Sequence, residues 1–236
     1  MMLDRRLATA ALALALAGSL AACGGDDKGS GDGDAGVDPQ EALAAAKTRL
    51  DETSGVRLSL TTDGEPDADY LSSAEGVIIA DPPAFQGTAA GKFQGIPASD
   101  VDVVSVDDIT YLALFGSFSE FELPKCVPDP ATLLDPDTGI ASLLALAEDP
   151  ESGKSVRGGE NNDQIVTPIT ATVPGEAVKN ILPCAPGATF EATFTIDDED
   201  ALTSAELTGE FFSGTGDLTY EITIDAYDVE QEISKP

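Results

Sequence analysis

The chain has 236 residues, of which 43 are Asp or Glu and 12 are Lys or Arg, so its formal net charge is -31. It contains no His, which excludes a Ser-His-Asp triad, a Cys-His dyad and a His-ligated zinc site. This negative charge argues against a nucleic-acid-binding protein and against electrostatic docking on anionic lipid headgroups. Because 42% of the residues are hydrophobic, the chain can still bury a core. We therefore expect a folded protein that is not an enzyme.

Residues 1–22 predict a lipoprotein signal peptide. Arg5 and Arg6 form a basic start, residues 7–17 are an apolar run, and small residues continue to Cys23. The run is too short to span a bilayer, which needs roughly 20 apolar residues. Residues 20–23, Leu-Ala-Ala-Cys, are similar to the bacterial lipobox, in which the Cys thiol is diacylated and the signal is removed just before it. The alternative is an ordinary secretory signal with a Cys nearby by chance.

Residues 23–37 predict a flexible acidic tether that begins at lipidated Cys23. From Gly24 to Val37 the chain is rich in Gly and Asp and has almost nothing to bury. In the random-coil regime such a segment reaches on the order of 20 Å. Two acyl chains on Cys23 would supply the stable anchor that one chain does not. We therefore expect the protein on the extracytoplasmic face of the cell membrane, lipid-anchored without spanning it.

Two further cysteines remain, Cys126 and Cys184. In an exported protein such a pair predicts a disulfide, for which only one pairing exists. It would close a loop of about 60 residues and contribute roughly 3–4 kcal/mol in the chain-entropy treatment. The alternative is two buried free thiols. A catalytic Cys is not expected, because the chain has no His to activate it.

Residues 38–236 predict one folded domain that begins with a helix. Asp38 can cap the helix, Pro39 suits its first turn, and Gly55 is a natural stop. After Gly55 the apolar period changes to two, which is typical of strands, and Asp107-Asp108 predicts a tight turn between two of them. The strands are expected near residues 57–62, 77–79, 85–93, 100–103 and 109–115.

The second half of the domain contains further helices and strands. Helical apolar spacing recurs at residues 138–147 and 175–182. A frame shift near Ser204 indicates a β-bulge. The fold class is therefore α+β, a single curved antiparallel β-sheet with helices packed on its concave face. The strands of this half are expected at residues 154–157, 165–173, 190–196, 202–211 and 218–226.

Alternation along the strands predicts an inward-facing apolar wall, which two leucines of helix 138–147 would face. Alternation cannot distinguish a hollow core from a filled one, and by itself it favours a packed core for the same residues. The acidic turns 107–108 and 197–200 lack the ligand spacing of an EF-hand loop, and we expect no metal and no cofactor. The predicted wall residues are Leu58, Leu60, Val77, Ile79, Phe85, Phe93, Val101, Val103, Tyr111, Leu143, Leu144, Ile169, Phe194, Leu207, Tyr220 and Ile222.

Residues 128–141, with the sequence Pro-Asp-Pro-Ala-Thr-Leu-Leu-Asp-Pro-Asp-Thr-Gly-Ile-Ala, carry a resemblance to a known family. The same resemblance is supported by three shorter matches, at residues 106–111, 119–121 and 176–178. On these motifs the domain resembles the LppX/LprA/LprF/LprG lipoproteins of actinobacteria, over nearly its whole length. The resemblance implies a half-barrel sheet whose open side is closed by helices, with a large apolar cavity between them.

By this resemblance, the protein is expected to bind an acylated lipid or glycolipid and to carry it between the membrane and the cell envelope. Some members are associated with a major-facilitator transporter, which makes such a transporter an implied partner. A cavity for a lipid should exceed about 300 Å³, the lower end for ligand pockets. The alternative is a non-enzymatic lipoprotein of envelope assembly or surface interaction, whose core is filled.

Overall fold

The computed structural model describes residues 37–93, 95–114, 116–159 and 163–236. The predicted signal peptide, the lipidation site Cys23 and the tether up to residue 36 lie outside these residues. The predicted boundary of the folded domain at residue 38 is not tested by this description. No helix in the described part of the chain is long and apolar enough to cross a bilayer.

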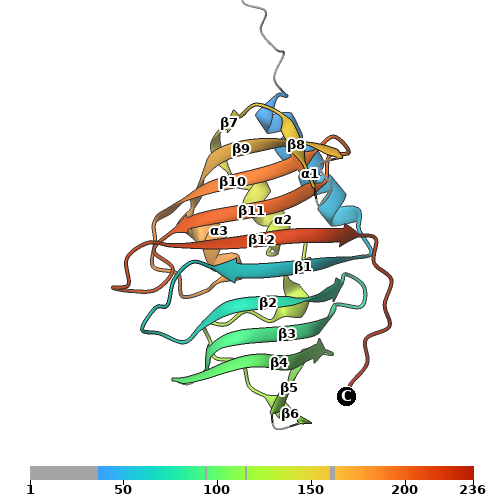
Figure 1. The fold of residues 1–236 in the computed structure, drawn as a ribbon, viewed down its shortest axis with the longest axis vertical. Coiled ribbons are helices and arrows are strands. Elements are labelled where there is room, and N and C mark those ends of the chain that lie inside the picture. The colour runs from blue at the N-terminus through green and yellow to red at the C-terminus, as the bar shows by residue number, and fades with distance from the viewer. Residues whose placement is uncertain (1–36, 94, 115, 160–162) are drawn as a thin grey trace, which may run out of the picture. The chain divides into compact units, whose positions relative to one another are not determined.

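Twelve strands form one antiparallel sheet, and its two edges do not pair with each other (Figure 1). The spatial order is β6-β5-β4-β3-β2-β1-β12-β11-β10-β9-β7, with β8 also paired to β9. The first and last strands are thus neighbours in the middle of the sheet. The strands are β1 Gly55–Thr62, β2 Tyr70–Ile79, β3 Ala84–Phe93, β4 Ile96–Val106, β5 Ile109–Leu114, β6 Ser117–Phe121, β7 Glu148–Ser152, β8 Val156–Gly158, β9 Gln164–Pro174, β10 Thr189–Asp197, β11 Leu202–Gly209 and β12 Leu218–Tyr227.

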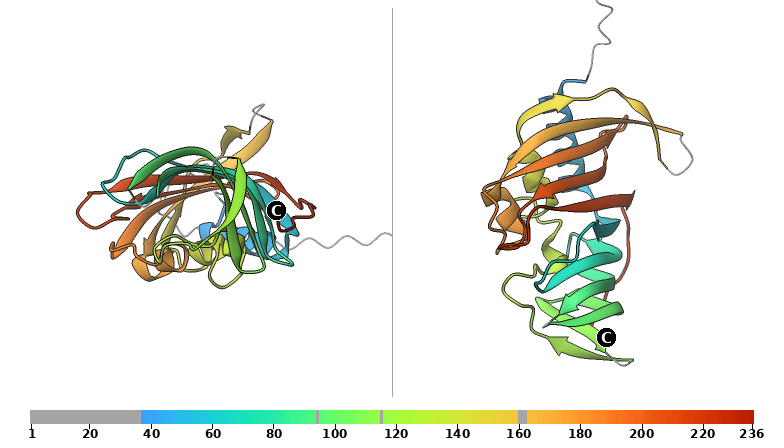
Figure 2. Two further views of the ribbon diagram at one scale, coloured as in Figure 1. Left: turned by 90° about the horizontal axis from the view of Figure 1, so that it is seen from below. Right: turned by 60° about the vertical axis from the view of Figure 1, so that its left-hand side comes forward.

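The sheet is curved, and the helices lie on its concave face (Figure 2). They are α1 Pro39–Glu52, α2 Ile140–Ala145 and α3 Gly175–Ile181, with a short 3₁₀ turn, η1, at Pro130–Thr132. Buried side chains of α1 and α2 join those of the strands in one apolar core. The predicted fold class, a curved antiparallel sheet with helices on its concave face, is confirmed.

Local sequence signals account for several elements. The Asp38 carboxylate accepts hydrogen bonds from the backbone N–H groups of Gln40 at 3.0 Å and Glu41 at 3.1 Å, which caps α1 as predicted. Asp107 and Asp108 adopt positive φ values of 55° and 61°, as a two-residue hairpin turn requires. The bulge expected near Ser204 is also present, because the pairing of β10 with β11 shifts register beside that residue.

Several elements differ from the prediction: strand β6 was not expected, and β2 begins at Tyr70, seven residues before the expected strand 77–79. The second helix covers Ile140–Ala145, not residues 138–147, because Asp135 holds Thr138 outside it: the Asp135 carboxylate accepts hydrogen bonds from the Thr138 backbone N–H and hydroxyl, both at 2.8 Å. These bonds also lower the pKa of Asp135 below its ordinary value. Strand β7, at Glu148–Ser152, was not predicted, because an acidic segment with a proline has no apolar alternation.

The convex face carries a second apolar cluster, covered by the last residues of the chain. We call residues 228–236 the C-terminal strap. It runs from β12 past β1 toward β5 (Figure 1), and its Val229 N–H donates to the Gly55 carbonyl oxygen at 3.0 Å. Near its end, the Lys235 ammonium lies 5.1 Å from the centre of the Tyr111 ring. Val229 and Ile233 pack on the buried outer residues Val77, Ile79, Ala84, Val104, Val106 and Tyr111.

Asp228 joins the strap to α1. Its carboxylate accepts hydrogen bonds from the Arg49 guanidinium at 2.7 and 3.3 Å, and these lower the pKa of Asp228 below its ordinary value. A lowered carboxyl pKa stabilises the fold above the ordinary value of about 3.9, and this contribution is lost as the pH falls through the folded-state pKa. The residue has a φ of 53°, which Asn tolerates well.

We therefore expect Asp228→Asn to lower the melting temperature at about pH 7, and the difference from the parent protein to shrink as the pH falls below about 3.9. Thermal unfolding monitored by circular dichroism across this pH range would measure it. A difference that stays constant with pH would show that the Arg49 pair does not stabilise the strap.

Candidate functional site

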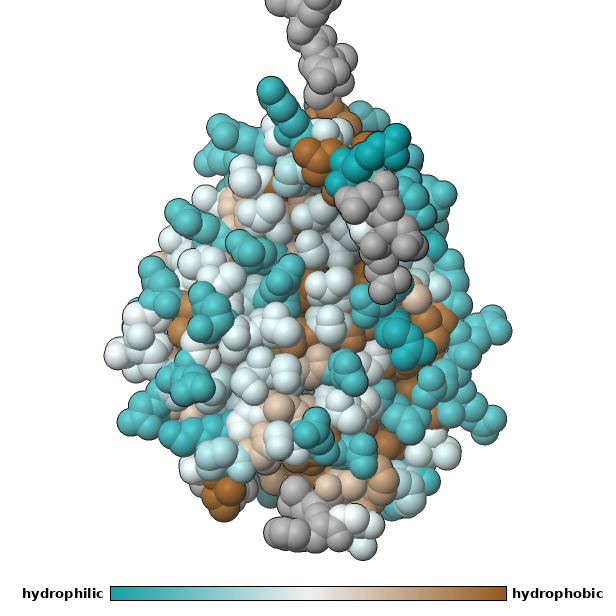
Figure 3. Space-filling model, in the orientation of Figure 1, coloured by the Kyte–Doolittle hydropathy of each residue, from teal (hydrophilic) through white to brown (hydrophobic). Residues whose placement is uncertain are grey.

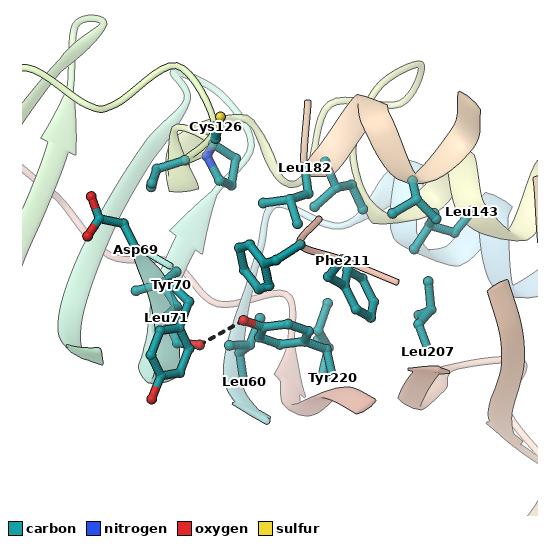
Figure 4. Close-up of a pocket in the computed structure, with 16 residues that line it drawn as sticks. Leu60, Asp69, Tyr70, Leu71, Cys126, Leu143, Leu182, Leu207, Phe211 and Tyr220 are labelled. Carbon is teal, nitrogen blue, oxygen red and sulfur yellow. Dashed lines mark hydrogen bonds between the residues drawn. The ribbon is translucent and has the colours of Figure 1, made fainter. Parts of the chain in front are cut away.

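Two apolar pockets lie between the concave face of the sheet and the segments that cover it. The first has a volume of about 100 Å³ and is bounded by the ends of β1 and β2, by α3 and by the aromatic residues around Phe211. Figure 4 shows Leu60 and Tyr220 on one side of this pocket and Cys126 and Leu182 on the other. Its lining residues are Leu60, Asp69, Tyr70, Leu71, Cys126, Val127, Pro128, Leu143, Val178, Ile181, Leu182, Leu207, Phe211, Phe212, Tyr220 and Ile222.

The second pocket has a volume of about 110 Å³ and lies over strands β2 to β5. Apart from the hydroxyl of Thr110, its side chains are apolar. Neither of the two apolar pockets reaches about 300 Å³, the lower end for ligand pockets, and the apolar space is divided between them. The lining residues are Leu58, Leu60, Leu71, Ala74, Phe85, Ala89, Phe93, Val101, Val103, Thr110, Leu112, Phe121, Leu123, Pro124, Val127, Pro128, Pro130, Leu133, Ile181 and Ile222.

The two pockets adjoin, because six residues line both of them. Three of the six come from the sheet, on β1, β2 and β12, and three come from the covering segments. The two pockets therefore meet where residues of the sheet and residues of its cover line both of them. The three sheet residues are Leu60, Leu71 and Ile222, and the three covering residues are Val127, Pro128 and Ile181.

Aromatic side chains build the far wall of the first pocket. The Phe211 ring lies 4.8 Å from the Phe190 ring and 4.9 Å from the Tyr220 ring, measured between centres. The Tyr220 hydroxyl donates to the Leu71 carbonyl oxygen at 3.0 Å, drawn as the dashed line in Figure 4. Burial raises the pKa of Tyr220, so its hydroxyl stays neutral. The wall thus presents uncharged ring surface to the pocket.

A pair of glycines positions the ring of Phe85 in the wall of the second pocket. Gly76 of β2 and Gly87 of β3 are directly paired. A Cβ atom at either position would lie 2.7 Å from a carbon of the Phe85 ring, closer than packed atoms approach. The missing side chains therefore leave the space that the ring fills.

A disulfide joins the two covering segments. Cys126 lies in the irregular stretch between β6 and η1, and Cys184 follows the end of α3. The predicted pairing of these two residues is confirmed, and both are exposed at the surface. The bond brings together two parts of the chain that are 58 residues apart, and both parts line the first pocket.

An open groove lies beside the second pocket, at the edge of the sheet near β5 and β6. Its volume is about 650 Å³, and it carries the acidic residues Asp108, Glu120, Glu122 and Asp129 together with Lys125. Residues that line both the groove and the second pocket are Thr110, Phe121, Leu123, Pro124 and Val127. The stretch after β6 therefore has the pocket on one side and the groove on the other.

The structure places ten of the sixteen predicted wall residues in the two pockets and three more in the surrounding core. Leu144, Ile169 and Phe194 are the three core residues, fully covered by their neighbours without lining either pocket. The ten that line the pockets are Leu58, Leu60, Phe85, Phe93, Val101, Val103, Leu143, Leu207, Tyr220 and Ile222.

The inward orientation predicted for Val77, Ile79 and Tyr111 is wrong, because all three lie in the cluster under the C-terminal strap. In the pairing of β1 with β2, Gly76 stands opposite Leu58, so Gly76 shares the inner face and Val77 does not. A shift of one residue moves every side chain of a strand to the other face. An apolar run such as Val77-Ile78-Ile79 does not reveal its phase when both faces are covered.

Sequence reasoning also missed several lining residues. Leu123, Pro124, Val127 and Pro128 belong to the irregular stretch around Cys126, where no helical or strand period exists to indicate a buried face. The sequence feature that could have indicated these lining residues was their apolar composition next to a cysteine predicted to form a disulfide. Helix 175–182 was expected, but its Val178, Ile181 and Leu182 were not assigned to the wall they help to form.

The acidic turns have structural explanations. The Asp197 carboxylate accepts hydrogen bonds from the backbone N–H groups of Glu199 at 2.9 Å and Ala201 at 2.8 Å, which stabilises the β10–β11 turn. Within the described residues, no group of three or more carboxylate or thiol side chains is arranged to hold a metal ion. The site that remains is the pair of apolar pockets.

Named relatives are similar to most of this chain. The lipoarabinomannan carrier protein LprG of Mycobacterium tuberculosis (strain ATCC 25618 / H37Rv) is 29% identical over 181 residues, which is 76% of this chain and 74% of the relative. The protein of the same name from Mycolicibacterium smegmatis is 28% identical over 212 residues, which is 86% of this chain and 87% of the relative.

Two crystal structures share the fold. Lipoprotein LppX of Mycobacterium tuberculosis matches with a TM-score of 0.62 and 18% identity, over 84% of this chain and 100% of that chain. LprF of Mycobacterium bovis matches with a TM-score of 0.66 and 15% identity, over 84% of this chain and 96% of that chain. The family model described as LppX_LprAFG lipoprotein matches residues 38–234. The chain belongs to the LppX_LprAFG lipoprotein family.

Proposed function

We propose that this lipoprotein binds an acylated lipid or glycolipid in the apolar space between its sheet and its helices, and carries it between the membrane and the cell envelope. The observation that carries the proposal is the pair of adjoining pockets, whose walls are almost entirely apolar side chains. The LprG relatives are named lipoarabinomannan carrier proteins, and these names support it. The chemistry needs no catalytic group, in keeping with a non-enzymatic role.

Acyl chains suit this site because apolar burial supplies the binding energy. Each CH₂ group withdrawn from water contributes about 0.8 kcal/mol, so a chain of about 16 carbons offers on the order of 12 kcal/mol before the costs of ordering. Uncharged walls such as the Tyr220 and Phe211 rings add no penalty for an apolar ligand. The acyl chains would be held inside, and the polar headgroup would remain in water.

We expect Ala89→Trp to reduce lipid uptake without unfolding the protein. Ala89 of β3 lines the second pocket, and an indole there would occupy the space of the acyl chain. Losing contact with only two CH₂ groups, at about 0.8 kcal/mol each, weakens binding roughly tenfold. Native mass spectrometry after incubation with phosphatidylcholine vesicles would measure the bound lipid.

Thr88→Trp is the matched control, because the preceding residue points to the other face of the same strand. It should retain the lipid load of the parent protein. If the parent protein itself retains no lipid from vesicles, the proposal fails. The small pocket volumes would then favour the alternative, a lipoprotein with a filled core that acts in envelope assembly or surface interaction.

The anchor is part of the same proposal: a diacylated Cys23, followed by the tether 24–37, would hold the domain at the extracytoplasmic face of the membrane. We expect Cys23→Ser to release the protein from the membrane fraction into the soluble extracytoplasmic fraction, because two acyl chains are what stable attachment requires. Cell fractionation and immunoblotting would measure the distribution. Retention of the variant in the membrane fraction would contradict the anchor. A major-facilitator transporter remains an implied partner.

A further inference from the structure

We infer that residues 122–128 and the C-terminal end of α3 with Cys184, joined by the Cys126–Cys184 disulfide, form a lid that must lift from the sheet before an acyl chain can be bound. We call these residues the lid. The inference rests on the proposed lipid-binding function and deepens it, because it names the part of the wall that controls access to the site.

The volume of the pockets requires some part of the wall to move. The two pockets hold about 100 and 110 Å³. Each pocket is therefore smaller than an engineered protein cavity of about 150 Å³, which accommodates one benzene molecule. An acyl chain of about 16 carbons is much larger than benzene, so neither pocket could hold it in this conformation. Binding therefore requires a conformation in which the two pockets are joined or enlarged.

The six residues that line both pockets indicate which part of the wall would have to move. Leu60, Leu71 and Ile222, which line both pockets, belong to β1, β2 and β12, and β1 pairs with the other two strands in the middle of the sheet. Their opponents belong to the lid, and Figure 4 shows the lid residues Cys126 and Leu182 across the pocket from Leu60. Lifting the lid would turn the two pockets into one continuous apolar channel. Moving the sheet would instead break its backbone hydrogen bonds.

Stretch 122–128 of the lid is weakly held by comparison with the sheet. Among the described residues, the backbone hydrogen bond that stretch 122–128 makes runs from Val127 N–H to the Pro124 carbonyl oxygen at 2.9 Å, within the stretch itself. Pro124 and Pro128 have no N–H to donate. Segments with few backbone hydrogen bonds open at a lower free-energy cost than paired strands do.

Both ends of stretch 122–128 are fixed, so its opening would leave the sheet and η1 in place. On one side, Phe121 pairs with Thr110 in the sheet. On the other side, the Asp129 carboxylate accepts a hydrogen bond from the buried Ser105 hydroxyl at 2.6 Å and caps η1 through the Ala131 N–H at 3.0 Å. The groove beside β5 and β6 gives the stretch open space to move into.

The disulfide decides how the lid moves. Because it ties stretch 122–128 to the end of α3, the two halves must lift together, and the contacts of both must be lost in one step. Without the bond, each half could open by itself, at the cost of its own contacts alone. Breaking the disulfide should therefore lower the free-energy barrier to entry and exit of the ligand. The apolar residues of the sheet should stay as they are.

The test measures the rate at which a pyrene-labelled diacylglycerol passes from phosphatidylcholine vesicles into the purified full chain, and from the loaded protein back into unlabelled vesicles. We expect the Cys126→Ala/Cys184→Ala double variant to exchange the probe at least about tenfold faster in both directions, since the separate halves open more often. Phe118→Ala, on the exposed side of β6, is the control and should exchange at the parent rate. Circular dichroism establishes that each variant is folded.

If the double variant does not fold, the Ile181→Ala variant is the test of the lid. It shortens a lid side chain that lines both pockets and leaves the disulfide in place. It should then exchange the probe faster than the parent protein. If the parent protein takes up the probe and the deciding folded variant exchanges it at the parent rate, the lid is refuted and the lipid-binding function stands. If the parent protein takes up no probe, the proposed function fails, and the lid fails with it.

Discussion

Replacing Phe190 with alanine is expected to lower the free energy of unfolding by about 3–5 kcal/mol, the usual cost of deleting a buried aromatic side chain. Phe190 of β10 is only 1% exposed and packs against the Phe211 ring, with centres 4.8 Å apart. Gly187 and Gly209 leave the space for its ring, since a Cβ atom at Gly187 would lie 2.7 Å from it. Alanine would leave a cavity that rigid backbone on both sides cannot close.

Urea unfolding of the parent and variant proteins, followed by circular dichroism, would measure this difference. Phe118→Ala removes the same side chain from a position that is 40% exposed on β6, and it should change the free energy of unfolding by no more than about 0.5 kcal/mol. Equal effects at the two positions would contradict the assignment of Phe190 to the core. A stable domain of this kind has only about 5–15 kcal/mol to lose.

Removing the disulfide with Cys126→Ala/Cys184→Ala is expected to destabilise the fold by about 3–4 kcal/mol. The bond closes a loop across a sequence separation of 58 residues, and the chain-entropy treatment assigns roughly this value to a loop of that length. The stabilisation arises mainly from the restricted unfolded chain, so the native sheet and helices should keep their positions. The effect on the lid is a separate, local one.

The comparison of urea midpoints with and without a reducing agent would separate these effects. Reduction should destabilise the parent protein by about the same amount as the double substitution and leave the double variant unchanged. A reductant that shifts the midpoint of the double variant equally would mean that the effect does not come from this bond. If removal of the bond changes stability but not ligand exchange, the disulfide only stabilises the fold, and the proposed lid is refuted.

Much of the fold follows from local signals in the sequence. Asp38 and Pro39 begin α1, Asp107 and Asp108 adopt the left-handed backbone of a tight turn, and a frame shift at Ser204 marks a bulge. The apolar alternation of β10 and β12 is also correct, because each has one face in the core and a second face near water. With Cys23 set aside as the predicted lipidation site, the two remaining cysteines allow only one pairing, so the disulfide could be predicted by counting.

The candidate site was predicted where alternation is clean and missed where it is not. Val101 and Val103 alternate with exposed acids, and both line the second pocket. Val77 and Tyr111 were assigned to the wrong face, because the C-terminal strap covers the convex side and makes both faces of these strands apolar. A covered outer face removes the polar residues that otherwise reveal the phase of a strand.

The sequence by itself therefore determined most of the helices and strands. It also determined most of the pocket-lining residues that the sheet contributes, because side chains in a strand alternate between its two faces. Only the tertiary structure decided the other half. Val127 and Pro128 have no period to show that they are buried, and their place opposite Leu60 depends on a disulfide to α3 and on a sheet that brings β1 beside β12. Division of the apolar space into two pockets is likewise a property of packing between distant segments, which no local pattern encodes.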